Sequence, residues 1–289
     1  MDGALLLQVL LNGLLQGGLF ALMALGLALV WGVLNIVNLA HGALIMLGGY
    51  VTWLLWSRFG LDPFAALPLA AACLAVLGYG LQRGILNLVM RGPAFNSLLV
   101  TFGLEVVITY LAQLAFTADY RTINPSYSGR SVALGAVTVP LVRVAVFAVA
   151  VALTLGMWQF LLRTRAGRRI RATAQNLTAA RLHGIEPRHL YALTFAIGAA
   201  LAGVAGGMYG MVSQLNPYIG ATLTAKCFAI SVIGGLDNPL GVIVGGLLLG
   251  VVEAYASLWP GSTFVDAVSF GLLVLVLVTR PTGLLGRTS

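Results

Sequence analysis

The sequence predicts an all-α fold, a polytopic helix bundle embedded in a membrane. Of the 289 residues, 60% are hydrophobic and only 8% are charged, whereas about a quarter of a typical soluble protein is charged. The apolar residues form runs that approach the roughly 20 residues needed to span a bilayer. One long polar interruption, residues 163–189, separates them and is called the basic loop here. We therefore predict a single transmembrane domain over residues 1–289, with the basic loop inside it.

The apolar runs define the expected helices in order. They cover residues 5–30, 43–56, 63–81, 97–116, 141–162, 190–212, 221–236, 240–258 and 264–279. This pattern predicts about eight or nine crossings. Because a Gly- and Asn-rich stretch at 31–42 precedes the short second run, we expect that segment to be broken. The N-terminus lacks a basic region and is apolar beyond signal-peptide length, which favours a retained first span. The turn-rich stretch 117–140 could carry a short surface helix.

The distribution of arginine predicts the orientation. The basic loop holds seven of the sixteen basic residues and one acid, Glu186. Lys and Arg near the ends of spans stay on the cytoplasmic side. Counting outward from this loop, eleven basic residues fall inside, namely the seven of the loop with Arg83, Arg91, Arg280 and Arg287. Four fall outside, Arg58, Arg121, Arg130 and Arg143, and Lys226 is unassigned. We expect a multi-pass membrane protein with its N-terminus outside and its C-terminus in the cytoplasm.

Several functional classes are excluded. The net charge of +8 lies next to membrane spans rather than on a soluble domain, so binding of nucleic acid is not expected. Cys73 and Cys227 lie in apolar runs, which indicates neither a disulfide framework nor a metal site. The sequence has no phosphate-binding loop, no metal-spaced His or Cys cluster and no Ser/His/Asp set. We therefore predict no catalytic residues, no metal and no cofactor bound by this chain, which is not expected to be an enzyme.

The basic loop is predicted to contain one short amphipathic helix. At helical spacing Ala166, Ile170, Ala174 and Leu177 share one face, and arginines cover the opposite face. Gly184 and Pro187 are expected to end this helix, and Arg181 interrupts its apolar face. Such a helix is suited to docking on a partner.

Polar residues inside apolar runs are candidates for a transport pathway. Asn35, Asn38 and His41 need polar partners, because an unpaired buried amide costs about 2 kcal/mol or more. They either bond to facing helices and hold a break in the chain, or line a pathway. Glu105 is the best of the ionisable candidates, because it lies in the middle of its run. Lys226 and Glu253 are weaker candidates, and Asp237 lies in a turn where Asp is ordinary.

Small residues recur four positions apart, a spacing that lets helices approach closely in lipid. The pairs are Gly13 and Gly17, Gly203 and Gly207, Gly206 and Gly210, Gly241 and Gly245, and Gly246 and Gly250. We expect most of them to pack within the chain, although one could form a subunit interface.

Three separated motifs resemble a known family. They are GVLNIVNLAHG at 32–42 followed by Met46, Gly48, Gly49 and Tyr50; TRAGR at 164–168 with AARLHGI at 179–185; and GG at 234–235 with GGLLLG at 245–250 and Glu253. Together they are similar to the LivH-type permeases of branched-chain amino-acid ABC importers. The cytoplasmic loop of such permeases often carries Glu-Ala-Ala followed four positions on by Gly. This chain keeps both alanines and Gly184 but has Thr178 in place of the Glu.

The resemblance implies an ABC-importer permease fold and a set of partners. These are a LivM-like second permease, two cytoplasmic ATPases that would bind the ATP and Mg, and a periplasmic or lipid-anchored binding protein. Membrane lipid would be a further partner of this chain. It also implies that the loop couples to the ATPases through Arg165, Arg168, Leu177, Ala179, Ala180, Gly184 and Ile185. The expected cargo is branched-chain or other hydrophobic amino acids. Urea, short amides and aromatic degradation products are alternatives within the family.

Two other classes stay open. An ion-coupled secondary carrier would use Glu105 or Lys226, although no clear inverted repeat is visible in the sequence. A purely structural membrane protein would use its polar residues only to hold helices together.

Overall fold

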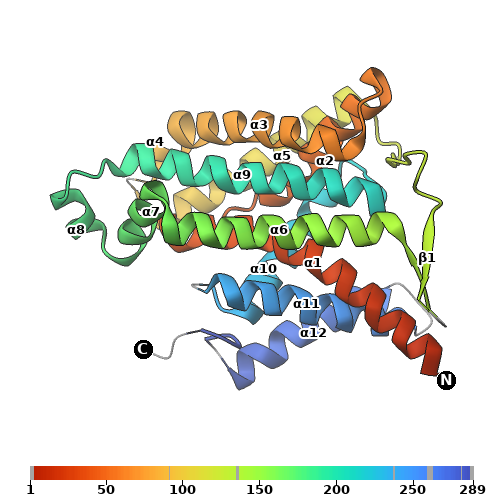
Figure 1. The fold of residues 1–289 in the computed structure, drawn as a ribbon. Coiled ribbons are helices and arrows are strands. Elements are labelled where there is room, and N and C mark those ends of the chain that lie inside the picture. Colours follow the sequence, from red (N-terminus) through yellow and green to blue (C-terminus); the bar gives the residue numbers. More distant parts are fainter. Residues whose placement is uncertain are drawn as a thin grey trace.

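The computed structural model is a bundle of helices (Figure 1). It describes residues 3–90, 92–134, 137–236, 238–258, 263–280 and 282–286. Arg91, Arg287, the turn residue Asp237 and most of the loop at 259–263 lie outside the described residues. The elements are α1 (Gly3–Leu34), α2 (His41–Phe59), α3 (Pro63–Leu81), the π-helix η1 (Gln82–Leu86), α4 (Asn87–Val89), α5 (Ala94–Phe116), β1 (Ser131–Leu134), β2 (Val137–Pro140), α6 (Leu141–Arg163), α7 (Arg165–Gln175), α8 (Leu177–Leu182), α9 (Pro187–Val212), α10 (Ile219–Gly234), α11 (Pro239–Ala256) and α12 (Thr263–Thr279).

Each predicted apolar run is helical. Six helices in the described residues are long and apolar enough to cross a membrane, as judged by length and composition: Gly3–Leu34, Pro63–Val89, Phe95–Phe116, Leu141–Arg163, Pro187–Val212 and Pro239–Ala256. Two further apolar helices, Ile219–Gly234 and Phe264–Thr279, are shorter. The predicted all-α membrane bundle is thus confirmed in its main features, whereas the count of eight or nine crossings is not.

The break near the second segment lies before α2 rather than within it. Helix α1 ends at Leu34 because Asn35 takes a left-handed conformation, with φ of 53°, and Asn is among the few residues other than Gly that do so readily. Residues 35–40 are not helical and run back along α1, so that His41, the first residue of α2, contacts the carbonyl of Met23. The predicted break at 31–42 is therefore narrower, and the expected broken second segment is instead a continuous helix that begins inside the bundle.

A long helix followed by a non-helical stretch and a helix that begins inside the bundle occurs a second time, with the chain running in the opposite direction. Helix α9 is followed by a non-helical stretch, 213–218, after which α10 begins inside the bundle. Helix α1 packs antiparallel on α11, and α9 packs antiparallel on α3. The order α1, α2, α3 is thus matched by α9, α10, α11 with inverted direction, a repeat that the sequence did not reveal.

The glycine pairs allow these close contacts. Gly17 lies against the backbone of Leu247, at 2.7 Å from Leu247 Cα to a Cβ built on the glycine. A Cβ built on Gly203 would lie 3.0 Å from the carbonyl oxygen of Ala70 and 3.1 Å from Leu74 of α3, and Gly245 lies against Ile230 of α10. All five predicted pairs pack within the chain. This confirms the expectation for most of them, and none of the five is left free for a subunit interface.

The outer loop differs from the expectation of a short surface helix. Its described residues instead form an antiparallel hairpin of β1 and β2, in which Val132 pairs with Val139, so the fold is not strictly all-α. Arg121 exchanges two backbone hydrogen bonds with Leu215 of the second non-helical stretch. Tyr127 donates a hydrogen bond of 2.9 Å to Asp62 at the start of α3. Burial and this bond raise the pKa of Tyr127. The loop is therefore held onto the bundle.

Candidate coupling loop and transport pathway

The basic loop contains two helices rather than the single predicted one. Asn176 ends α7 and begins α8, with an extended backbone (φ −155°, ψ 102°). Its side-chain oxygen accepts a hydrogen bond of 2.9 Å from the backbone N–H of Ala179, and such an N-cap contributes about 1 kcal/mol. Asn favours this cap over the helix interior. The helical periodicity alone could not show the interruption.

The end of α8 explains why three of the predicted coupling residues belong together. The N–H of Ile185 donates to the carbonyl of Ala180 at 3.1 Å, and the N–H of Gly184 donates to that of Arg181 at 3.0 Å. This is the Schellman pattern, in which a left-handed residue ends the helix. Gly184 has φ of +75°, as this pattern requires. The predicted role of Gly184 as helix end is confirmed, whereas Pro187 begins α9 instead.

Helix α7 packs tightly on the end of α6, and this contact is called the root of the basic loop here. Thr164 accepts a hydrogen bond from the N–H of Gly167 at 3.0 Å, and a Cβ on Gly167 would overlap the carbonyl oxygen of Phe160. Ile170 is buried, as is Thr173. Arg165 and Arg168 are exposed. Helix α7 therefore lies tightly on the end of α6, and its arginines remain on the surface.

Helix α8 projects away from the bundle (Figure 1). Ala180 is buried, Leu177 is half-buried and Ala179 is exposed. Leu182 is 84% exposed, which makes it the apolar tip of this helix. Leu182 was not among the residues predicted to contact a partner. An apolar side chain between Arg181 and His183 in an otherwise polar loop was nevertheless a signal in the sequence for such a contact. The basic loop thus presents a small apolar surface on α8, next to the basic helix α7 that packs tightly on α6.

The two helices that start inside the bundle meet at their N-termini. The N–H of Gly42 donates to Thr224 Oγ1 at 2.8 Å, and this hydroxyl lies 3.0 Å from the carbonyl oxygen of Leu39. A Cβ on Gly42 would overlap the carbonyl of Gly220. From this crossing α2 runs to the outer loop and α10 runs to the segment where Leu284 bonds to Ile233. Discontinuous helices that meet in this way form substrate sites in several transporters.

Two of the predicted pathway residues lie at this crossing. Asn38 is 1% exposed and His41 is fully buried. His41 Nε2 lies 2.9 Å from the carbonyl oxygen of Met23. Because a carbonyl only accepts, Nε2 carries the hydrogen, and Nδ1 is an acceptor without a partner among the described residues. Asn38 Oδ1 accepts from the N–H of Ala40 at 3.2 Å, whereas its Nδ2 is also unpaired. Asn35 is exposed and lies apart, beside α7.

The third element of this region is a polar stripe on α5. Every fourth residue is polar, and the stripe consists of Ser97, Thr101, Glu105, Thr109 and Gln113. Thr101 Oγ1 lies 3.0 Å from the carbonyl of Val37 in the non-helical stretch. Glu105 is half-buried and accepts a hydrogen bond from Thr109 at 3.3 Å. The sequence analysis found Glu105 but missed the spacing of the other four, which places all five on one face.

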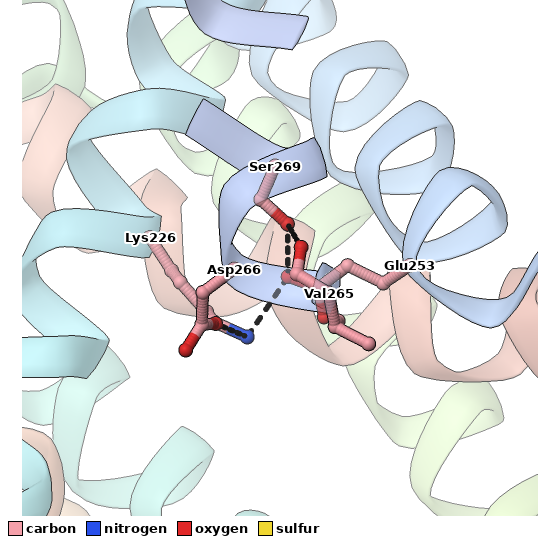
Figure 2. A network of polar contacts seen from close by, with 5 residues as sticks. All are labelled: Lys226, Glu253, Val265, Asp266 and Ser269. Atoms are coloured by element: carbon pink, nitrogen blue, oxygen red, sulfur yellow. Dashed lines mark hydrogen bonds and ion pairs between the residues drawn. The ribbon is translucent and has the colours of Figure 1, made fainter. Parts of the chain in front are cut away.

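An ionic network joins the last three helices, α10, α11 and α12, and Figure 2 shows its residues. Lys226 of α10 lies 2.8 Å from Glu253 of α11 and 3.3 Å from Asp266 of α12. Ser269 donates a further hydrogen bond to Glu253 at 2.8 Å. The side chains of Lys226 and Glu253 are 16% and 5% exposed. The structure therefore pairs two ionisable residues that the sequence could only treat separately.

Among the described residues no group of three His, Cys, Asp or Glu side chains could hold a metal ion. The geometry combines an exposed basic loop at one end of the bundle with a buried crossing of α2 and α10 beside the polar stripe of α5.

Comparison with known proteins identifies the family to which a chain with these two features belongs. Residues 9–277 match the family model described as the permease component of the branched-chain amino acid transport system. The chain belongs to this permease family. The family is one of transport permeases, so the chain is a multi-pass membrane transport component and not an enzyme. No solved structure matches.

Named relatives of this permease extend over nearly its whole length. It is 35% identical to the high-affinity branched-chain amino acid transport system permease protein BraD of Pseudomonas aeruginosa, over 97% of this chain and 96% of the relative. It is 32% identical to the corresponding permease protein LivH of Escherichia coli, with the same coverage. It is also 28% identical to the permease protein LivM of Escherichia coli, over 93% of this chain and 68% of LivM. The predicted resemblance to LivH-type permeases is confirmed.

Proposed function

We propose that this permease is the translocating subunit of an ATP-driven importer that moves branched-chain or other hydrophobic amino acids across the bacterial inner membrane. The family membership carries this proposal, and the two LivH-type relatives support the substrate class. The exposed α8 and the crossing of α2 with α10 supply the two parts that such a subunit needs, a contact for an ATPase and a polar region inside the bundle. Urea, short amides or ion-coupled transport have no comparable support.

The proposed assembly contains a LivM-like second permease, two cytoplasmic ATPases that bind ATP and Mg, and a periplasmic or lipid-anchored binding protein. The N-terminus of this chain lies outside and its C-terminus in the cytoplasm, because the four arginines of α7 favour the inner side. With α2, α10 and α12 counted beside the six longer helices, nine segments enter the bilayer. The chain acts as one transmembrane domain, residues 1–289, with a coupling loop at 163–189.

Coupling in this proposal occurs through the basic loop. The ATPase contacts Ala179 and Leu182 on α8, while Ala180, Gly184 and Ile185 keep the helix end in shape. Leu177 connects α8 to α7. Because Gly167 and Ile170 root α7 on α6, a push on α8 is passed to the bundle as a rigid-body movement. Arg165 and Arg168 add charge for partner attraction.

The pathway in this proposal runs between the α2/α10 crossing and the polar stripe of α5. Asn38 and His41 contribute the unpaired Nδ2 and Nδ1 atoms, and Glu105 contributes the charge of the stripe. Asn35 lies at the inner end. A buried polar atom without a partner costs about 1–3 kcal/mol, so its retention in a membrane interior is consistent with use during transport.

The assembly test starts from the tagged chain, purified in mild detergent from its native host. Two ATP-binding subunits and a second permease should come with it, and the reconstituted complex should take up leucine only with ATP and the binding protein. Recovery of the chain alone, with uptake driven by an ion gradient, would contradict the proposal.

Charging the tip of α8 is expected to uncouple the importer. Leu182→Glu should lower ATP-driven leucine uptake by roughly tenfold or more, since truncating or charging a central interface residue typically costs 2 kcal/mol or more. Uptake into proteoliposomes and recovery of the ATPases on the tagged chain are measured together. Leu285→Glu is the matched control, because Leu285 is also an exposed leucine beside the end of α10 but lies outside the loop. Equal loss in both variants, or no loss in Leu182→Glu, would remove α8 from the contact.

Removing the charge of Glu105 is expected to lower uptake about tenfold while the assembly stays intact. Glu105→Gln keeps the acceptor for Thr109 and removes only the charge, so a structural defect is not expected. The measurement is leucine uptake together with ATPase recovery. Asp119→Asn is the matched control and should leave uptake unchanged, because it removes an exposed carboxylate beyond the end of α5 that also accepts a hydrogen bond from a threonine, Thr117. Wild-type uptake by Glu105→Gln would place Glu105 outside the pathway.

A further inference from the structure

A cavity of about 690 Å³ lies beside the root of the basic loop. Its walls come from the second half of α1, the end of α6, α7 and the turn between α10 and α11. This volume is within the range of about 300–1,000 Å³ that is usual for ligand pockets. The cavity is separate from the α2/α10 crossing, since neither His41 nor Thr224 lines it. Asn35, at the inner end of the proposed pathway, and α7 of the basic loop border the cavity, but neither of the roles proposed above uses its volume.

The lining of the cavity is amphipathic. Leu29 and Val33 of α1 and Leu161 of α6 make one side apolar, and Arg171 and Gln175 of α7 make the other side polar. Asn35 adds an amide. No Asp or Glu lines the cavity in the described part of the chain. The site therefore offers hydrocarbon contact at one end and a positive charge with amide groups at the other.

Arg171 is free to bind an anion. Among the described residues its guanidinium has one hydrogen-bond partner, the carbonyl of Leu162 at 3.4 Å, which is beyond the usual length for such a bond. The ion pairs found in the described residues involve Lys226 and not Arg171. An arginine that faces a cavity without a carboxylate is suited to a phosphate, which it can bind through two parallel N–H groups.

We propose that this cavity binds an anionic phospholipid of the cytoplasmic leaflet, with an acyl chain against Leu29, Val33 and Leu161 and the phosphate at Arg171. The proposal rests on the orientation given under the proposed function, which places α7 at the inner surface where anionic lipids lie. A zwitterionic amino acid fits less well, because none of the described lining residues is a carboxylate that could pair with its ammonium group. A lipid bound here contacts both α6 and α7, and so stabilises the root of the coupling loop.

The test measures binding of phosphatidylglycerol to the purified full chain by native mass spectrometry, with phosphatidylcholine as the uncharged-headgroup comparison. Arg171→Gln should weaken phosphatidylglycerol binding about fivefold, as expected for one basic residue near an anionic headgroup. Arg169→Gln is its matched control, because Arg169 is an exposed arginine of the same helix that does not line the cavity.

A second pair of variants tests the volume of the cavity and leaves the charge of Arg171 unchanged. Gly32 lines the cavity and has no atom within 4 Å of a Cβ built on it, so Gly32→Leu adds a side chain in open space. It should abolish retained lipid. Gly156→Leu on α6 also meets open space but lies outside the cavity, so it should retain lipid as the wild type does. Unchanged thermal stability in detergent would show that each variant is folded.

Four results would overturn the proposal. They are equal binding of phosphatidylglycerol and phosphatidylcholine, equal loss in Arg171→Gln and Arg169→Gln, displacement of the lipid by leucine or by inorganic phosphate at millimolar concentration, and loss of the lipid when the second permease binds. Lipid binding is measured on the chain alone and leucine uptake on the assembled importer. A chain that binds lipid without assembling an importer would therefore contradict the proposed function and not this site.

Discussion

Replacing Lys226 by Met is expected to lower the free energy of unfolding by about 3–5 kcal/mol, the usual cost of removing one partner of a buried ion pair. The substitution keeps an unbranched side chain that is one atom shorter, but leaves the 5% exposed carboxylate of Glu253 without its cation. Ser269 alone cannot compensate, because it supplies one hydrogen bond. The measurement is unfolding of the purified chain in mixed micelles under an increasing fraction of denaturing detergent.

Two further variants test this explanation. Lys226→Met with Glu253→Leu removes both charges, so most of the lost stability should return. Asp266→Asn should cost less than about 1 kcal/mol, because the Asp266 side chain is 55% exposed and solvent weakens its ion pair. If Lys226→Met were as stable as the wild type, or if the double variant were less stable than the single one, the network would not be what joins α10, α11 and α12.

Replacing Gly206 by Ala is expected to cost about 3 kcal/mol, at the upper end for overpacking of a dense core. The added Cβ would overlap the carbonyl oxygen of Ile45 and would lie 2.8 Å from the N–H nitrogen of Gly49. Both atoms belong to the backbone of α2, so no rotamer change can make room. The two helices would have to separate near the α2/α10 crossing, and leucine uptake should fall with stability.

The matched control for this substitution is Gly103→Ala on α5. A Cβ on Gly103 has no neighbour within 4 Å, and Ala favours a helix over Gly by about 1 kcal/mol. Gly103→Ala should therefore be neutral or slightly stabilising in the same detergent titration. A Gly206→Ala variant as stable as the wild type would show that α2 and α9 are not packed as closely as described.

The positions of the helices followed from local composition. Each apolar run became a helix, since a chain in lipid must satisfy its backbone groups internally. The end at Gly184 was predictable because few other residues adopt a left-handed conformation cheaply. The split of the basic loop at Asn176 was not predicted, because the apolar spacing continues across it from Ile170 to Leu177. Only the competing cap formed by the Asn176 side chain interrupts the helix.

Which faces meet could not be read from the runs themselves. Membrane helices are apolar on all sides, so periodicity does not mark the buried face as it does in a soluble helix. The contact of Gly42 with Thr224 joins residues far apart in the chain, and so does the pairing of Lys226 with Asp266. The polar stripe of α5 was visible as a spacing, but nothing local showed that Thr101 meets the carbonyl of Val37.

The sequence by itself determined that this chain is a helical membrane protein, where its helices lie, the basic character of the loop at 163–189 and, through three motifs, its permease family. These follow from composition and from short-range chemistry. Only the tertiary structure decided that α2 and α10 begin inside the bundle and meet at their N-termini, that Lys226, Glu253 and Asp266 form one network, and that a cavity with Arg171 lies beside α7. Such features depend on how uniformly apolar helices pack, and packing of that kind is set by shape and by a few polar contacts across the whole chain.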